Sequence, residues 1–162
     1  LSPEDRAKLT VVSPDTGRVR VADTWSDSLG APLAIIHKRR DPNVANQVTG
    51  REIGGQVDGR VCLLVDDMID TGGTIVKAAQ ALKKNGAERV IVAATHAVFS
   101  DPASERLLDA SIDEVVVTVT IPIPDRKRWE TLTVLPIAPL LARAIREVFE
   151  DGSVTSMFDG AA

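Results

Sequence analysis

A pair of aspartates and the glycine-containing turn behind it form the segment of this sequence best suited to chemistry. Asp66 and Asp67 end an apolar run, and the residues DTGGT, at 70–74, then open a segment with helical periodicity. Glycine lets a backbone approach a ligand closely, and the free N–H groups at the start of a helix, together with the helix dipole, favour phosphate. The hydroxyls of Thr71 and Thr74 add two donors. We therefore predict a phosphate site at 70–74.

The two aspartates must face something other than the phosphate, because a carboxylate beside a phosphate repels it. Neutral hydroxyls, such as the 2- and 3-hydroxyls of a ribose, and a bound Mg²⁺ are the partners that suit them. The predicted binding residues are Asp66, Asp67, Asp70, Thr71, Gly72, Gly73 and Thr74. A plain helix start with Asp70 as its N-cap is an alternative. An aspartic protease is disfavoured, because its Asp-Thr-Gly lies in an all-β fold with a second copy, and this chain has one copy followed by a helical segment.

The elements that must position these residues alternate between short β-branched runs and longer helical segments. Strands are predicted over 9–12, 32–37, 60–65, 89–96, 114–120 and 131–135, and helices over 18–29, 74–85, 104–108 and 138–149. Such alternation is typical of an α/β fold with a parallel sheet and helices on both faces. We expect a sheet of about five to six strands. The polar segment 38–59 is long for a connection and is predicted to be a functional or mobile loop.

Other polar residues follow other predicted strands. Lys38 and Arg40 come directly after the strand predicted at 32–37, and Asp15 follows the one at 9–12. Taken alone, the cations are typical of a solvated strand end and Asp15 is typical of a turn. Ligands of open parallel sheets bind outside the carboxyl ends of the strands, so these positions also favour a place at the same cleft.

The composition indicates one globular domain over residues 1–162, with 44% hydrophobic and 26% charged residues. A single cysteine, Cys62, excludes an intramolecular disulfide and fits a reducing compartment such as the cytoplasm. No apolar run reaches the roughly 18 residues of a membrane span, so no membrane partner is expected. A net charge of −4 and 3% aromatic residues do not favour nucleic acid as a partner.

The segment DDMIDTGGT resembles the ribose 5-phosphate and phosphoribosyl diphosphate (PRPP) signature of type I phosphoribosyltransferase folds. In its longer context it resembles the ribose-phosphate pyrophosphokinase (PRPP synthetase) family, with an actinobacterial character. Further matching segments follow in the same order as in that family: VVSPDTG, AIIHKRR, ATHAVFSDPA, TIPIP and SVTSMFDG. The resemblance covers practically the whole chain and corresponds to the C-terminal half of a two-domain synthetase.

The resemblance implies a role for each matching residue. Asp66 and Asp67 match the acids at the ribose hydroxyls, and 70–74 matches the loop around the 5-phosphate. Lys38 and Arg40 match a mobile catalytic loop whose cations stabilise the transferring diphosphate, and Arg40 also matches a ribose 5-phosphate contact. Two further matches complete the implied site: Asp15 with a Mg²⁺ ligand, and 153–158 with a segment bordering a regulatory phosphate or ADP site between subunits.

The implied reaction is that of a ribose-phosphate diphosphokinase, in which the C1 hydroxyl of ribose 5-phosphate attacks the β-phosphorus of MgATP to give PRPP and AMP. The family also implies a homo-oligomer, a hexamer, in which the N-terminal half supplies much of the ATP site. Nothing here matches that half, so this chain is expected to be slow or inactive by itself. Two alternatives stay open: a stand-alone phosphoribosyltransferase using PRPP and a nucleobase, and a non-catalytic regulatory subunit of the synthetase.

Overall fold

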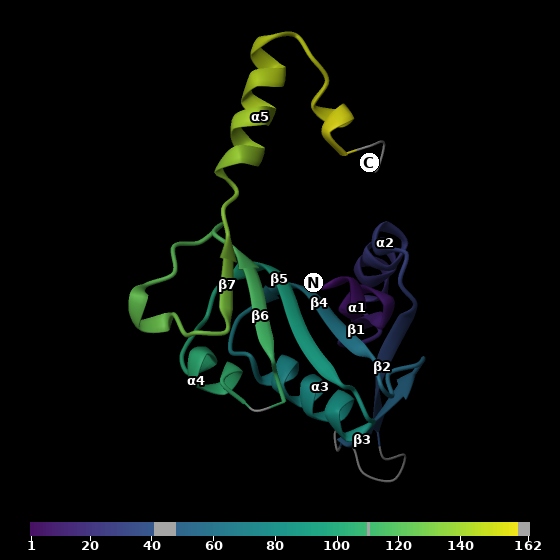
Figure 1. The fold of residues 1–162 in the computed structure, drawn as a ribbon. Helices are drawn as coiled ribbons and strands as arrows, with labels where there is room; N and C mark the ends of the chain where they lie inside the picture. The colour runs from purple at the N-terminus through teal and green to yellow at the C-terminus, as the bar shows by residue number, and fades with distance from the viewer. Residues whose placement is uncertain (41–47, 110, 159–162) are drawn as a thin grey trace.

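A seven-stranded sheet forms the centre of the computed structural model (Figure 1). The structure describes residues 1–40, 48–109 and 111–158, with side chains throughout these ranges except at 38–40 and 48–51. The strands are β1 (Leu9–Ser13), β2 (Leu33–Arg40), β3 (Val48–Gly54), β4 (Val61–Ile69), β5 (Arg89–Ala97), β6 (Glu114–Thr118) and β7 (Leu132–Leu135). The helices are α1 (Pro3–Ala7), α2 (Val19–Leu29), α3 (Gly73–Lys84), α4 (Ala103–Leu107) and α5 (Ala138–Phe149), with short 3-10 turns η1 (Asp125–Lys127) and η2 (Val154–Phe158).

The strand order is β3-β2-β1-β4-β5-β6-β7. All neighbouring pairs are parallel except β2 and β3, which are antiparallel. The predicted α/β class with a largely parallel sheet is therefore confirmed. Within the described residues, none of the helices is both long and apolar enough to cross a membrane.

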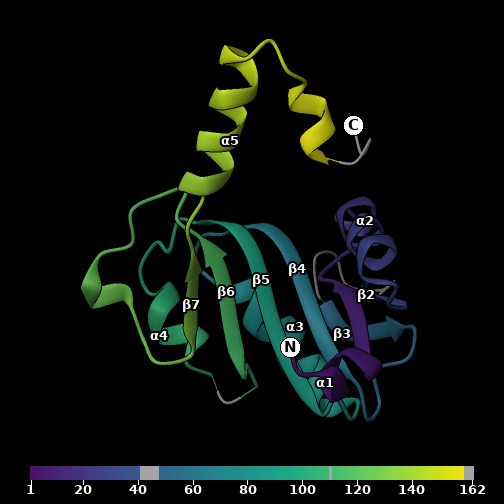
Figure 2. The ribbon, with the colours of Figure 1, turned by 45° about the horizontal axis from the view of Figure 1, so that its top comes forward.

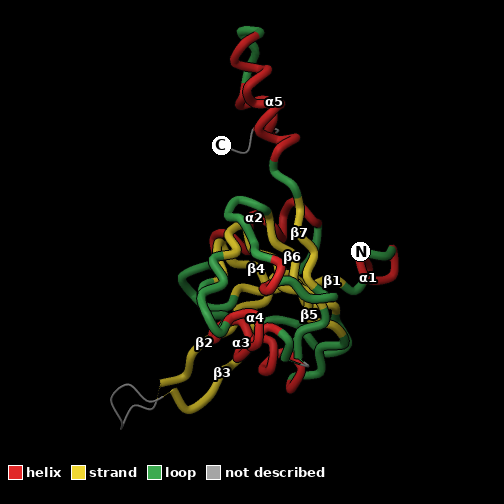
Figure 3. Tube along the Cα trace, turned by 90° about the vertical axis from the view of Figure 1, so that its left-hand side faces the viewer, coloured by secondary structure: helices red, strands yellow, loops and turns green. Residues whose placement is uncertain are grey.

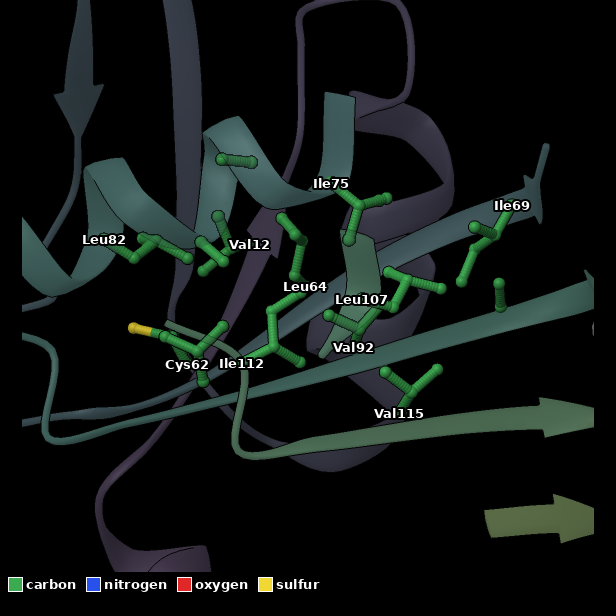
Figure 4. Packing of buried hydrophobic residues seen from close by; sticks show 14 of the residues in the cluster. Val12, Cys62, Leu64, Ile69, Ile75, Leu82, Val92, Leu107, Ile112 and Val115 are labelled. Carbon is green, nitrogen blue, oxygen red and sulfur yellow. The ribbon is translucent and has the colours of Figure 1, made fainter. Parts of the chain in front are cut away.

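Apolar residues of β4 fill the core on both faces of the sheet. Cys62 and Leu64 belong to a cluster that includes α3 and α4 residues such as Ile75 and Leu107 (Figure 4). Leu63 belongs to a second cluster, together with residues of β1 and α2. Because successive side chains of a strand point to opposite faces, the two clusters lie on opposite sides of the sheet. Helices thus cover both faces, as predicted.

The predicted loop at 38–59 is wrong in part. β2 continues to Arg40, and β3 returns beside it, with Ile36 opposite Ile53 and His37 opposite Glu52. Edge strand β3 is rich in residues with low strand propensity, including two glycines. Its strand conformation comes from pairing with β2, which a local pattern does not reveal. This strand also raises the count from the expected five to six strands to seven.

The structure places α5 apart from the sheet. No residue of this helix is buried, and its main contacts are with η2. Figures 1 and 2 show α5 extending beyond the end of β7. Figure 3 shows the β2–β3 hairpin projecting from the opposite end of the domain. The packed part of the domain therefore lies between these two projections.

Candidate functional site

The candidate site lies where the strand order reverses along the chain. From β1 the chain passes through α2 to β2 on one side, and from β4 it passes through α3 to β5 on the other side. Buried residues of α2 and of α3 belong to the two different apolar clusters, so these helices cover opposite faces. In open α/β sheets a crevice forms at such a reversal, outside the carboxyl ends of the strands, and ligands bind there.

A cavity of about 320 Å³ occupies this position. Its walls come from the loop after β1, the end of β4 and the start of α3: Asp15, Arg18, Asp66, Met68, Ile69, Asp70, Thr71, Gly72, Gly73, Thr74 and Ile75. The fold thus brings Asp15 to the same cavity as Asp66 and segment 70–74, from which it is far apart in the sequence. Asp67 is outside this lining but contacts Arg18, which is part of it.

Gly72 and the helix behind it shape the 70–74 turn. Gly72 has a left-handed φ of +73°, and a Cβ built on it would lie 3.4 Å from Leu107 of α4. A residue with a side chain would therefore be strained here. Arg106 of α4 donates a hydrogen bond from Nη1 to the Thr71 carbonyl oxygen at 3.1 Å. Because the C=O and N–H of a trans peptide point in opposite directions, this bond directs the Gly72 N–H away from Arg106.

The first amides of α3 are not capped by a side chain. Gly72 is the N-cap residue, and no side-chain hydrogen bond from the described part of the chain caps this helix. The alternative in which Asp70 is the N-cap is therefore wrong, because the helix begins two residues too late for that carboxylate to occupy the cap position. Uncapped N–H groups at a helix start are the arrangement that suits an anion.

Asp66 and Asp67 lie within β4, which continues to Ile69 and does not stop at the predicted end of the apolar run. The carboxylates are held by the strand itself: the Asp67 N–H donates to Asp66 Oδ1 at 2.9 Å, and the Met68 N–H donates to Asp67 Oδ1 at 2.8 Å. The Asp66 side chain is only 14% exposed, whereas that of Asp67 is 35% exposed.

The two adjacent carboxyl groups differ in acidity. Burial first, and the hydrogen bond with Asp67 second, raise the pKa of Asp66 to about 6. Burial alone would raise the pKa of Asp67 too, but its hydrogen bond with Asp66, the charge of Arg18 and the Met68 N–H together lower it. Asp67 is therefore the stronger acid of the pair, and Asp66 changes its charge closest to neutral pH.

Arg18 is a site residue that the sequence analysis missed. It precedes α2, and its guanidinium reaches both acids, with Nη1 at 2.7 Å from Asp67 Oδ2 and Nε at 3.3 Å from Asp66 Oδ1. The signal that could have found it is its place in the loop after the first strand, close behind Asp15.

Asp15 has the chemistry of a single Mg²⁺ contact. Its Oδ1 accepts a hydrogen bond from the Gly17 N–H at 2.9 Å, and the residue lines the cavity. Among the described residues there is no group of three or more His, Cys, Asp or Glu arranged for a metal. Mg²⁺ in phosphoryl-transfer sites is commonly held by one or two carboxylates together with substrate phosphates, and one lining carboxylate fits that mode.

The structure describes the remaining predicted site residues only in part. The backbones of Lys38 and Arg40 belong to β2, opposite Arg51 and Val48 of β3, and their side chains lie outside the described residues. Segment 153–158 contains η2, which contacts α5 and is not part of the cavity lining.

Comparison with known proteins places the chain in a family. The phosphoribosyl synthetase-associated domain matches residues 52–159, which is more than half of the sequence. The chain belongs to this family. The resemblance to the PRPP synthetases is confirmed by a ribose-phosphate pyrophosphokinase of Streptomyces coelicolor, 65% identical over 155 residues that cover 96% of this chain and 48% of that protein.

Other members of the family give the same result. A ribose-phosphate pyrophosphokinase of Mycobacterium leprae is 58% identical, over 95% of this chain and 47% of that protein. The crystal structure of phosphoribosylpyrophosphate synthetase from Mycobacterium smegmatis matches with a TM-score of 0.80 and 55% identity, over 90% of this chain and 46% of that chain. The chain therefore spans about half the length of the curated relatives it matches.

Proposed function

We propose that this chain is the sugar-phosphate-binding, C-terminal half of a ribose-phosphate diphosphokinase, which transfers the diphosphate of MgATP to the C1 hydroxyl of ribose 5-phosphate. The observation that carries the proposal is the cavity, whose lining includes the uncapped start of α3 and Asp66 of the acid pair of β4. The relatives that cover nearly the whole chain support it, since they are named for this activity.

The proposed assignment follows the chemistry of each group. The N–H groups and hydroxyls of 70–74 are donors, which suit the 5-phosphate of the sugar. The carboxylates of Asp66 and Asp67 are acceptors, which suit the 2- and 3-hydroxyls. A sugar lying along the cavity in this way would direct C1 away from 70–74, toward the open side where a nucleotide has to approach.

The remaining roles belong to the nucleotide side of the site. Lys38 and Arg40 would stabilise the charge that develops on the transferring diphosphate, which is the main task of a protein in phosphoryl transfer. Asp15 would hold Mg²⁺, which when bound neutralises phosphate oxygens. A cytoplasmic location and assembly into a homo-oligomer, a hexamer as in the family, are part of the same proposal.

The test begins with binding of ribose 5-phosphate to the 162-residue chain by calorimetry. We expect weak binding, which Thr71→Val weakens by about tenfold because it removes a hydroxyl donor to a charged phosphate. Thr24→Val is the matched control, since the Thr24 hydroxyl donates to the Arg20 carbonyl within α2, outside the cavity lining. Equal loss in both variants, or no binding by the parent chain, would contradict the assignment of 70–74.

Enzyme assays distinguish the proposed synthetase half from a stand-alone phosphoribosyltransferase. With ATP, Mg²⁺ and ribose 5-phosphate, we expect little or no AMP from this chain by itself, because about half the length of the relatives is not represented in it. Pyrophosphate released from PRPP when a nucleobase is added would instead identify a phosphoribosyltransferase. Full synthetase activity would show that the chain needs no further part.

A further inference from the structure

The cavity at the end of β4 has an unusual charge for a site that takes an anion. Three of its lining residues are acidic, namely Asp15, Asp66 and Asp70. Among the lining residues that the structure describes, Arg18 is the one with a positive charge. A phosphate entering such a cavity is repelled by the carboxylates unless a cation offsets them.

Arg18 is placed to act on the two acids of β4 together. Its Nη1 lies 2.7 Å from Asp67 Oδ2 and its Nε lies 3.3 Å from Asp66 Oδ1, so one guanidinium bridges neighbouring carboxylates. The Arg18 side chain is 40% exposed. The guanidinium therefore attracts an anion in the cavity as well as the two carboxylates. In a fully buried ion pair, the positive and negative charges would offset each other and leave little attraction for a ligand.

The bridge leaves acceptors for a ligand. Asp66 Oδ1 forms the ion pair with Arg18 and accepts a hydrogen bond from the Asp67 N–H, and Asp67 Oδ1 accepts one from the Met68 N–H. Each carboxylate oxygen has two lone pairs, so the pair still accepts hydroxyl donors with the guanidinium in place. Arg18 and a diol are thus compatible ligands of the same two acids.

We infer that Arg18 is a specificity-determining residue: it is the counter-ion that lets this acid-lined cavity accept a phosphorylated sugar. The inference rests on the proposed function and adds to it a residue from the opposite face of the sheet. Arg18 acts through its charge on the phosphorylated ligand and through the acid pair that it neutralises. It is a positioning residue for Asp66 and Asp67, not a group that takes part in bond breaking.

Two substitutions separate the charge of Arg18 from the geometry of its contacts with the two acids. Arg18→Lys keeps the charge and loses the two-pronged contact, and Arg18→Gln keeps hydrogen-bond donors and loses the charge. For ribose 5-phosphate binding by calorimetry, we expect Arg18→Gln to raise Kd by about tenfold. Arg18→Lys should stay within about threefold of the parent chain, because most of the electrostatic attraction remains.

The salt dependence of binding supplies a second readout. Raising the ionic strength should weaken binding by the parent chain more than by Arg18→Gln, because screening acts on the attraction that this variant has lost. Arg20→Gln is the matched control, since Arg20 is an exposed residue of α2, the helix that follows Arg18, and lies outside the cavity lining. The Kd of this variant should equal that of the parent chain. Thermal unfolding of each variant checks the fold, and exposed ion pairs contribute little to it.

Three results would overturn the inference. Loss of binding in Arg18→Lys with full binding in Arg18→Gln would show that hydrogen bonds matter and the charge does not. Tighter binding in Arg18→Gln would show that Arg18 competes with the ligand for the acids. Equal Kd values in all variants would show that Arg18 is not involved, whereas failure of the parent chain to bind ribose 5-phosphate would instead contradict the proposed function.

Discussion

Asp66 combines two properties that usually conflict, because it is almost buried and lies beside a second carboxylate. Burial raises its pKa to about 6, well above that of an unfolded aspartate. The folded chain therefore holds the Asp66 proton more tightly than the unfolded chain does. The stability that this preference contributes is therefore fully present below about pH 4, where both states are protonated, and is lost as the pH rises from about 4 through about 6.

Above pH 6, the ionised and largely buried Asp66 carboxylate destabilises the folded chain, and Asp66→Asn tests this effect. The amide has the same shape and no charge, so at pH 7.5 the variant should be more stable than the parent chain by about 1–3 kcal/mol. At pH 4 the difference should be small, because Asp66 is then neutral in the folded state. Urea unfolding at both pH values measures the effect, and a variant less stable at pH 7.5 would contradict it.

At the scale of elements, the turn between β4 and α3 depends on one glycine conformation. Gly72 has a φ of +73°, and its missing side chain leaves room for Leu107. Gly30 provides a matched comparison, because it has a similar φ of +60° at the end of α2 but no atom within 4 Å of a built Cβ. An alanine at either position would have to adopt the same strained left-handed backbone conformation. Only at Gly72 would its Cβ contact another residue, and only Gly72 lies in the cavity lining.

We expect Gly72→Ala and Gly30→Ala to destabilise the chain by similar amounts, about 1–2 kcal/mol each, from the left-handed backbone. The Cβ of Gly72→Ala would make only ordinary van der Waals contact with Leu107. Gly72→Ala alone should weaken ribose 5-phosphate binding, since it displaces the amides of 70–74. Calorimetry and thermal unfolding on both variants measure the two effects. Normal binding by Gly72→Ala would show that the turn conformation is not needed for the ligand.

Elements with a local pattern were predictable from the sequence, and those that depend on a distant partner were not. The apolar run that ends at Val65 predicted β4, and apolar periodicity predicted α5 with the observed bounds of 138–149. β3 was missed because its strand conformation comes from pairing with β2. Arg18 was missed for the same reason, since the acids that give it a role lie on another strand.

At the scale of the whole molecule, burial is unevenly distributed. Leu82 of α3 is fully buried in the core, whereas Leu141 of α5 is 52% exposed. None of the residues of α5, all of which the structure describes, is buried. Both are leucines within twelve-residue helices. Their contributions to stability should therefore differ through packing and not through helix propensity.

Leu82→Ala should destabilise the chain by about 2–5 kcal/mol, because it leaves a cavity between α3 and the sheet. Leu141→Ala should change the free energy of unfolding by no more than about 0.5 kcal/mol. Chemical denaturation of the two variants under the same conditions provides the comparison. A large loss of stability in Leu141→Ala would mean that α5 packs against the rest of the chain in solution.

The reversal of strand order at β1 and β4 has a mechanical consequence. Arg18 leads into α2 on one face of the sheet, and segment 70–74 leads into α3 on the other face, so the sheet lies between these two helices. A small molecule that contacts both Arg18 and segment 70–74 would link the start of α2 to the start of α3. A ligand bound in the cavity would then reduce the motion of both helices relative to the sheet, and its release would restore that motion.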